Sequence, residues 1–227
     1  MSRILITGAR APAALHLARA LAASGHEVHA ADTLSQPLTK ASRTVARYHR
    51  LPPPSEEPEA FADALGDLVA SVRPSHVIPT CEEVFYLAWA FETRGFGRTA
   101  SMGGAPTRLV APSFDVLARA HDKAAFAADA RACGMAPPDT VRLSDRDAVV
   151  ALAGEASGLV FKPVWSRFAA RVLIAPEPGE LKELAPSPES PWVAQALISG
   201  EELCAYAIAE RGQVRALAIY KPTYRAG

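Results

Sequence analysis

The first hundred residues alternate short apolar runs with longer segments in which apolar positions recur every three or four residues. The apolar runs cover residues 3–7, 27–31 and 76–79, and a further short strand is expected at 47–51. Helical spacing predicts helices over 13–24, 41–46, 61–72 and 82–91. Strands that alternate with helices are typical of βαβ units. We therefore expect an α/β domain with a doubly wound parallel sheet over residues 1–110.

The pattern changes after a segment rich in Gly, Pro, Ser and Thr at 95–112, which marks a domain boundary. Helices are predicted over 114–120, 122–133, 144–152 and 177–184, and strands over 159–163, 171–174, 192–197, 203–209 and 214–220. The last two strands flank Glu210-Arg211-Gly212-Gln213, which indicates a β-hairpin. Residues 111–227 are therefore expected to form an α+β domain with antiparallel strands.

Composition narrows the classes of partner. Lys and Arg number 24 and Asp and Glu also number 24, which argues against a nucleic-acid or membrane-surface partner. No apolar run approaches the roughly 20 residues of a membrane span. The three cysteines are far apart and form no CxxC pair, so we expect reduced thiols, no zinc site and a cytoplasmic protein.

The turn after the first strand carries Gly8 but lacks the other glycines of the dinucleotide-binding fingerprint. A Rossmann-like framework without a bound dinucleotide is therefore favoured, and Asp32 is interpreted as a strand-end residue rather than a ribose ligand. A reductase or epimerase that uses NAD(P) remains a less favoured alternative. Farther on, Thr80 and Glu83 have the spacing of a capping box. Glu82, at the end of a parallel strand, is a candidate substrate contact.

Lys162 is the strongest single signal, because it lies in the apolar strand Leu-Val-Phe-Lys-Pro. A buried ammonium needs an anion, either a structural carboxylate or a nucleotide phosphate. The sequence otherwise favours Arg over Lys, which suggests that this position requires a compact ammonium. Ser166 and Arg167 follow in a loop that could cover a triphosphate, together with Arg171.

A second candidate nucleotide contact lies about thirty residues farther on. Residues 195–197 end a predicted strand, where backbone groups and the Gln195 side chain could pair with an adenine edge. Of the paired glutamates in the following turn, Glu202 could hold ribose hydroxyls or share a Mg²⁺ ion.

The order of these parts resembles the ATP-grasp superfamily, in the branch of carbamoyl-phosphate synthase large chain and biotin carboxylase. The resemblance rests on the first βαβ unit, on VIPTCEEVFYLA, on HDKAAFAADARACGMAPPDT, on LVFKP and on WVAQALISGEEL. It implies a Rossmann-like pre-ATP-grasp domain followed by an ATP-grasp domain. It also implies an ATP site in which Lys123 and Lys162 contact phosphate. In such a site, adenine would contact the hinge formed by Gln195, Ala196 and Leu197, and ribose would contact Glu202.

The resemblance further implies ATP- and Mg²⁺-dependent ligation of a small-molecule carboxylate to an amine through an acyl phosphate. Lys221 and Arg225 are further candidate substrate contacts. The family's metal-binding carboxylates lie C-terminal to this region, and no Asp or Glu follows Glu210. We therefore expect an incomplete ATP-grasp domain in a truncated chain without metal ligands. A non-catalytic nucleotide-binding module remains an alternative, and an exposed apolar face could support a homodimer.

Overall fold

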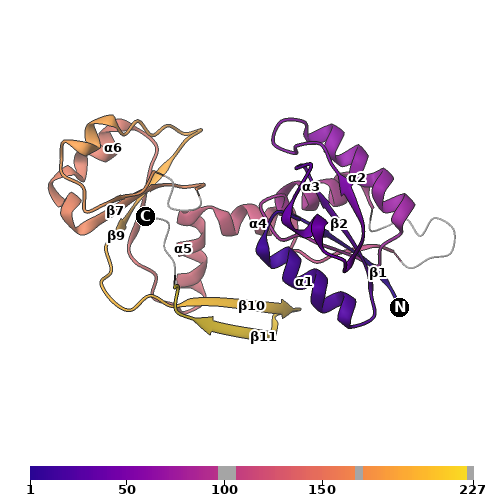
Figure 1. The fold of residues 1–227 in the computed structure, drawn as a ribbon. Coiled ribbons are helices and arrows are strands. Elements are labelled where there is room, and N and C mark those ends of the chain that lie inside the picture. The colour runs from indigo at the N-terminus through magenta and orange to yellow at the C-terminus, as the bar shows by residue number, and fades with distance from the viewer. Residues whose placement is uncertain (97–105, 167–170, 224–227) are drawn as a thin grey trace. The chain divides into compact units, whose positions relative to one another are not determined.

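The computed structural model describes residues 1–96, 106–166 and 171–223. The chain divides into two compact units, Met1–Ala118 and Arg119–Gly227, and the division falls inside helix α4 (Phe114–His121). The sequence predicted a boundary near residue 110, a few residues earlier. Figure 1 shows the helices and strands of both units.

The first unit contains a five-stranded parallel sheet of order β3-β2-β1-β4-β5. Its strands are β1 (Arg3–Thr7), β2 (Glu27–Asp32), β3 (Val45–Arg50), β4 (His76–Ile78) and β5 (Arg108–Leu109). The helices that precede α4 are α1 (Pro12–Ala23), α2 (Pro58–Val72) and α3 (Val84–Arg94). The chain winds outward from β1 first through β2 and β3, and then through β4 and β5. This order confirms the doubly wound α/β architecture and places a topological switch point between β1 and β4.

Alternating residues of β1 build a core on each face of this sheet. Ile4 and Ile6 pack in one cluster with Ala14 and Ala18 of α1. Leu5 packs in another cluster with residues of α2 and α3, among them Phe61, Leu65 and Leu87. Because both faces are covered, β1 reads as a continuous apolar run rather than as an alternating one.

Three predictions for the first unit differ in detail from the structure. Residues 108–109, inside the expected boundary segment, form β5 and pair with β4. The expected helix over 41–46 is replaced by a 3₁₀ turn, η1 (Leu38–Ala41), and β3 already begins at Val45. The helix expected from residue 82 begins at Val84.

The second unit contains an antiparallel sheet of order β6-β9-β7-β8. The strands are β6 (Thr140–Leu143), β7 (Leu159–Pro163), β8 (Leu173–Ile174) and β9 (Trp192–Ala196). The other elements are α5 (Lys123–Ala132), α6 (Arg146–Ala151) and the 3₁₀ turns η2 (Ala153–Gly158) and η3 (Glu180–Glu183). The α+β prediction is confirmed. β6 was not predicted, and η3 replaces the helix expected over 177–184.

One face of this sheet carries the core of the second unit. Phe161, Ala194 and Leu143 come from the three neighbouring strands and pack with residues of α6, η2 and η3. The members of this cluster are Leu143, Val149, Ala156, Phe161, Leu181, Leu184, Trp192 and Ala194. Because side chains alternate along a strand, the residues between these core positions lie on the opposite face.

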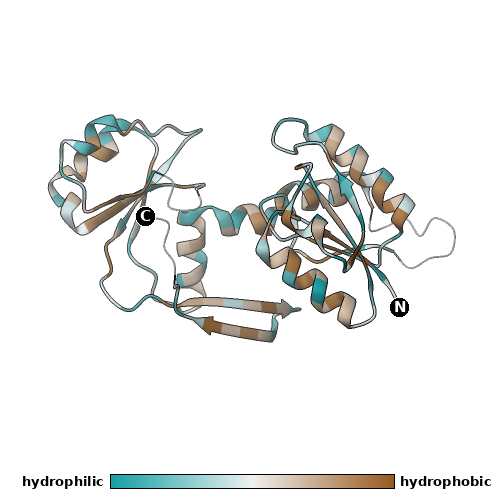
Figure 2. Ribbon diagram, viewed as in Figure 1, coloured by the Kyte–Doolittle hydropathy of each residue, from teal (hydrophilic) through white to brown (hydrophobic). Residues whose placement is uncertain are grey.

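The predicted hairpin is confirmed as β10 (Cys204–Glu210) and β11 (Gln213–Tyr220), which form a separate two-stranded sheet. Arg211 and Gly212 both have positive φ, 51° and 79°, as a two-residue hairpin turn requires. The hairpin is strongly apolar (Figure 2), yet its side chains are exposed. Among the described residues, no helix is long and apolar enough to cross a membrane.

Candidate functional site

Lys162 lies on the polar face of the second unit's sheet. In the register of β6, β9 and β7, Val160 pairs with Gln195 and Gln195 pairs with Thr140. Lys162, two residues beyond Val160, therefore shares a face with Gln195 and Thr140. Phe161 points to the opposite face and is fully buried. The sequence-based expectation of a lysine buried in an apolar strand is corrected here, because Lys162 is only partly buried.

A chain of hydrogen bonds joins these three side chains. Lys162 Nζ donates to Gln195 Oε1 at 2.6 Å, and Gln195 Nε2 donates to Thr140 Oγ1 at 2.8 Å. The Thr140 hydroxyl donates in turn to the carbonyl oxygen of Pro138 at 2.8 Å. The structure thus brings together two of the predicted site residues and one, Thr140, that the sequence reasoning missed.

The charge of Lys162 is not compensated by any carboxylate among the described residues. Its hydrogen-bond acceptor is a neutral amide. Burial lowers the pKa of the Lys162 ammonium, because removal from water disfavours the charged form. An anion placed beside this ammonium would restore the lost stabilisation of the charge.

Lys123 is held close to the loop that follows β7. Its Nζ donates to the carbonyl oxygens of Val164 at 3.0 Å and Ser166 at 2.8 Å. The helix start is fixed by Asp122, whose carboxylate accepts from the backbone N–H groups of Ala124 and Ala125, both at 3.0 Å. Two predicted phosphate contacts, Lys123 and Lys162, are therefore tied to the same end of β7.

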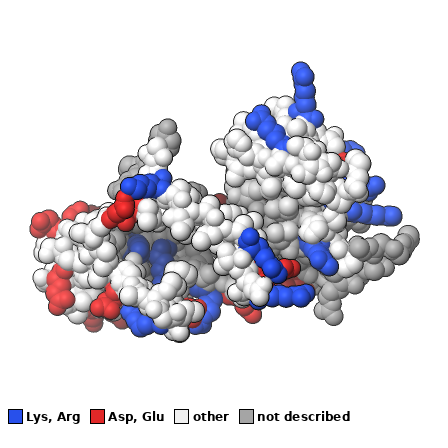
Figure 3. Space-filling model, turned by 90° about the horizontal axis from the view of Figure 1, so that it is seen from below, with Lys and Arg blue, Asp and Glu red and all other residues white. Residues whose placement is uncertain are grey.

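An ion pair fixes α5 against the sheet. Arg142 Nη1 donates to Asp122 Oδ2 at 2.7 Å, and its guanidinium lies 5.5 Å from the centre of the Trp165 ring. Burial raises the pKa of the Asp122 carboxyl, but the backbone N–H groups and Arg142 outweigh that effect and lower it. On the face shown in Figure 3, the second unit carries Lys and Arg side chains in a recess and acidic side chains along its outer surface.

The other predicted nucleotide contacts are less closely grouped. The backbone N–H groups of Ala196 and Leu197 already donate to Asp139 O at 2.9 Å and Gly158 O at 2.8 Å. Glu202 is exposed and lies between β9 and β10. The Ser166 hydroxyl donates to Pro163 O at 3.2 Å. Arg167 lies outside the described residues.

The predicted substrate contacts near the end of the chain are placed only in part. Lys221 pairs with Glu201, the first of the paired glutamates. Both side chains are largely exposed, which makes this a weak surface pair. Arg225 lies outside the described residues.

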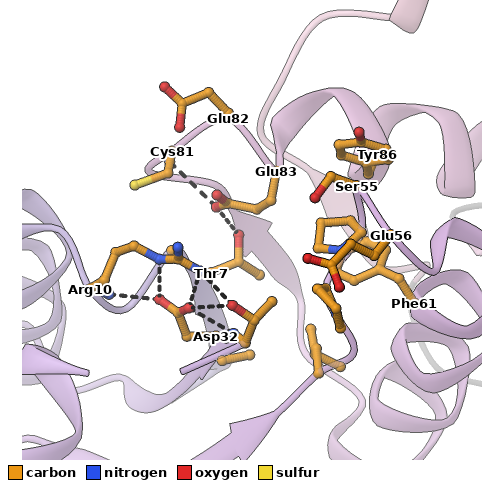
Figure 4. Close-up of a pocket in the computed structure, with 16 residues that line it drawn as sticks. Thr7, Arg10, Asp32, Ser55, Glu56, Phe61, Cys81, Glu82, Glu83 and Tyr86 are labelled. Carbon is orange, nitrogen blue, oxygen red and sulfur yellow. Dashed lines mark hydrogen bonds and ion pairs between the residues drawn. The ribbon is translucent and has the colours of Figure 1, made fainter. Parts of the chain in front are cut away.

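The first unit holds a cavity of about 320 Å³ at the carboxyl ends of its parallel strands (Figure 4). Ligands in doubly wound sheets bind at this edge, outside the switch point. The residues that line the cavity come from the ends of β1, β2 and β4, from the segment after β3 and from α2 and α3: Thr7, Gly8, Arg10, Ala31, Asp32, Thr33, Leu51, Pro53, Pro54, Ser55, Glu56, Phe61, Cys81, Glu82, Glu83 and Tyr86.

Asp32 serves the structure of this cavity wall. Its side chain is fully buried, and its carboxylate accepts from the backbone N–H and Nε of Arg10 at 2.8 and 3.1 Å. It also accepts from the backbone N–H groups of Thr33 at 2.7 Å and Leu34 at 3.2 Å. Burial raises the pKa of Asp32, but these bonds outweigh burial and lower it. With its oxygens engaged in this way, Asp32 is not available as a ribose ligand, in agreement with the sequence-based interpretation.

Gly8 shows why the turn after β1 does not suit a dinucleotide. A Cβ at this position would lie 2.6 Å from Thr80 Oγ1 and 2.8 Å from Glu83 Oε1, and φ is +68°. The Thr80 hydroxyl donates to the carbonyl oxygens of Thr7 at 2.8 Å and Gly8 at 3.0 Å. The turn after β4 thus packs tightly on the turn after β1, which leaves little room for a close pyrophosphate.

Glu83 links the same two turns. Its Oε1 accepts from Thr7 Oγ1 at 2.6 Å and from the backbone N–H groups of Thr80 at 3.3 Å and Cys81 at 3.4 Å. The predicted capping box is therefore wrong in part, because Glu83 reaches the Thr80 N–H but Thr80 does not cap α3. Burial, followed by the charge of Glu83, raises the pKa of the Cys81 thiol. In Figure 4, Glu82 points away from the Arg10–Asp32 pair.

No protein-family model matches this sequence, and no curated protein matches it significantly. The fold, however, is similar to that of solved structures. L-amino acid ligase from Bacillus licheniformis matches with a TM-score of 0.71 at 17% identity, over 100% of this chain and 52% of the ligase. A complex of biotin carboxylase from Campylobacter jejuni with β,γ-ATP matches with a TM-score of 0.65 at 12% identity, over 90% of this chain and 47% of the carboxylase.

A third similar structure contains a bound nucleotide and metal. It is the biotin carboxylase domain dimer of 2-oxoglutarate carboxylase from Hydrogenobacter thermophilus, in complex with MgADP, ADP and bicarbonate. It matches with a TM-score of 0.57 at 16% identity, over 85% of this chain and 43% of that protein. This chain thus spans about half the length of the structures it matches. The chain therefore has the fold of these proteins over the part that it shares with them, as the resemblance to the ATP-grasp superfamily led us to expect.

Proposed function

We propose that this chain binds ATP and belongs to an ATP-dependent ligase that joins a carboxylate to an amine. The observation that carries the proposal is the uncompensated ammonium of Lys162, held on the polar face of a sheet whose fold is that of ATP-grasp enzymes. In this proposal the first unit is the pre-ATP-grasp domain, and the second unit is the described part of the ATP-grasp domain. The similar structures, two of which contain adenine nucleotides, support this choice of ligand.

The proposed roles follow from charge and position. Lys162 and Lys123 neutralise phosphate oxygens, with Ser166 and Arg167 in the loop that covers them. The adenine base is proposed to contact the strand end at Gln195, Ala196 and Leu197. The ribose hydroxyl groups are proposed to bind Glu202. Because the N–H groups of Ala196 and Leu197 are engaged, the base would contact other backbone groups at the exit of β9.

The proposed reaction has two steps. An oxygen of the substrate carboxylate attacks the γ-phosphorus of ATP, which forms an acyl phosphate and releases ADP. The amine then attacks the acyl carbon and phosphate leaves. In both steps the lysine ammonium groups stabilise the negative charge that develops on the phosphate oxygens of the leaving group.

Magnesium enters the proposal only as the companion of the nucleotide. Within the described ranges, no group of three or more His, Cys, Asp or Glu side chains could hold a metal ion. No residue described here is therefore assigned to the metal.

The cavity of the first unit is proposed as the place where a substrate contacts Glu82. Its lining contains four carboxylates, Asp32, Glu56, Glu82 and Glu83, and one arginine, Arg10. This excess of negative charge favours an amine over a carboxylate as the occupant. Lys221 and Arg225 stay proposals as contacts for the carboxylate substrate.

Direct titration with ATP tests the proposal. We expect the Lys162→Ala variant to bind ATP about ten- to a hundredfold more weakly than the wild type, because a charged hydrogen bond is lost. Lys182→Ala is the matched control, since Lys182 is exposed on η3. Circular dichroism verifies that both variants stay folded. Equal affinity of the wild type and Lys162→Ala for ATP would show that Lys162 does not bind the nucleotide, and would contradict the proposal.

A second measurement separates the two nucleotide hypotheses. If ATP binds, ADP release is measured with mixtures of small carboxylates and amines. Release that requires both substrates supports the ligase, whereas binding without turnover supports a non-catalytic nucleotide-binding module. Enhanced NAD(P)H fluorescence on mixing would instead favour the dinucleotide alternative, which the packing around Gly8 and Asp32 argues against.

A further inference from the structure

The hydrogen-bond chain from Pro138 to Lys162 has a fixed direction. The Thr140 hydroxyl has one proton, and it donates that proton to the carbonyl oxygen of Pro138. The Thr140 oxygen is therefore the acceptor for the Gln195 amide nitrogen at 2.8 Å. This bond in turn directs the amide oxygen of Gln195 toward Lys162 Nζ, at 2.6 Å.

The direction matters because the amide of Gln195 can point either way. Rotation of the amide by 180° would place its NH₂ group against the ammonium of Lys162, so that two donors would face each other. Thr140 removes that alternative, because its oxygen can accept from the NH₂ group while its own proton is committed to Pro138. Lys162 is thereby held by an acceptor that carries no charge.

Because the acceptor is neutral, the positive charge of Lys162 stays available for an anionic ligand. A carboxylate in place of the Gln195 amide would pair with Lys162 and cancel its charge within the protein. The amide positions the ammonium without cancelling the charge, so the full attraction remains for an incoming anion. Arg142, which shares this face of the sheet, is paired with Asp122.

We propose that Thr140 is a positioning residue that acts through Gln195 to hold Lys162 for a nucleotide phosphate. This inference rests on the proposed function, and it gives the Gln195 side chain a role toward the lysine in addition to its place beside the base. Thr140 itself contacts no ligand in this proposal. The strand pairing of β6 with β9 is made by backbone groups, so the Thr140 hydroxyl is not needed for the sheet.

Three variants at two positions test the proposal. Thr140→Val keeps the shape and strand preference of the residue but removes the hydroxyl, and we expect ATP affinity to fall about five- to tenfold. Thr140→Ser restores the hydroxyl and is expected to bind within about twofold of the wild type. Gln195→Glu keeps the acceptor but adds a charge, and we expect affinity to fall by about tenfold or more while the thermal midpoint is maintained.

A second readout follows the lysine itself without any nucleotide. The pH dependence of Lys162 acylation, located by mass spectrometry, reports the pKa of its ammonium. We expect Thr140→Val to lower that pKa, because the oriented acceptor is lost, and Gln195→Glu to raise it, because a carboxylate favours the charged form. A residue that only supported the fold would leave the lysine's pKa unchanged in Thr140→Val.

The two proposals fail in different ways. If the wild type does not bind ATP, the proposed function fails, and the role of Thr140 toward a phosphate fails with it. If the wild type binds ATP but Thr140→Val binds equally well, only the positioning proposal is overturned. It is also overturned if Thr140→Ser loses as much affinity as Thr140→Val, because the hydroxyl would then not be the group that matters.

Discussion

A pair of stacked histidines at the edge of the first unit's sheet makes the stability of the protein depend on pH. His29 of β2 and His49 of β3 stack with ring centres 5.2 Å apart and share a hydrogen bond of 2.9 Å between Nδ1 and Nε2. The other ring nitrogen of His29, Nε2, donates to the Glu27 carboxylate at 3.0 Å. Burial, followed by the charges of His29 and Arg47, lowers the pKa of His49 to about 4.

This lowered pKa predicts loss of stability in mild acid. The pKa of a histidine in the unfolded chain is about 6.5. Between this pH and the pKa of folded His49, the unfolded chain binds more protons than the folded chain does. The free energy of unfolding therefore falls as the pH is lowered through this range. Because His49 is partly exposed, we expect a discounted loss of about 1 kcal/mol between pH 7 and pH 5. Urea unfolding at the two pH values measures it.

The His49→Gln variant should show a smaller difference between the two pH values than the wild type. His16→Gln is the matched control, because His16 is exposed on α1 and should leave the pH dependence unchanged. An unchanged pH dependence in His49→Gln would show that protonation of His49 does not cause the loss of stability in acid.

Some residues of the candidate site could be predicted from the sequence, and others could not. The chemistry of Lys162 followed from its residue type and its strand. Its place on the polar face also follows from the alternation with Phe161, but the expectation of a buried lysine overlooked that alternation. Thr140 could not be found in this way, because its partner Gln195 lies 55 residues away along the chain. Such contacts depend on strand register, which the sequence alone does not specify.

At the scale of elements, strongly patterned segments were predicted and weakly patterned ones were missed. The strands of the βαβ opening and the hairpin have long apolar or alternating runs. β5 has two residues and exists only because β4 offers it a hydrogen-bonding edge. β6 alternates polar and apolar residues after Pro137-Pro138, a signal that was present but short. Tertiary pairing decides such elements, and local pattern does not.

The hairpin gives a prediction at this scale. Tyr206, Ile208, Leu217 and Ile219 are between 52% and 64% exposed, and both strands carry apolar side chains on both faces. An exposed apolar hairpin is a template for association. We expect the wild type to form larger species as its concentration rises, and Leu217→Glu to shift the equilibrium toward monomer, as measured by sedimentation velocity.

A matched surface variant distinguishes the hairpin from general stickiness. Val150→Glu introduces the same charge at an apolar residue of α6 that is 57% exposed, similar to Leu217. It should leave the association of the wild type unchanged. A wild type that is monomeric at all concentrations, or an equal effect of Val150→Glu, would contradict the prediction that this chain associates through the hairpin.

At the scale of the whole molecule, the described residues build separate cores in the two units. Leu65 belongs to the core of the first unit and Leu181 to that of the second, and both are almost fully buried. Because each unit has its own core, we expect two thermal transitions in calorimetry. Leu65→Ala and Leu181→Ala form a matched pair, and each should lower one transition, through a loss of about 2–5 kcal/mol in its own unit.

These two variants then show where the nucleotide acts. A ligand stabilises the unit that binds it, by about 2.7 kcal/mol at a hundredfold excess over the dissociation constant. We expect ATP to raise the transition that Leu181→Ala lowers, since Lys162 and Lys123 lie in that unit, and to leave the other near its original temperature. If ATP raised only the transition that Leu65→Ala lowers, the nucleotide would bind at the cavity of the first unit. The assignment of the phosphates to Lys162 would then be wrong, whatever the affinity.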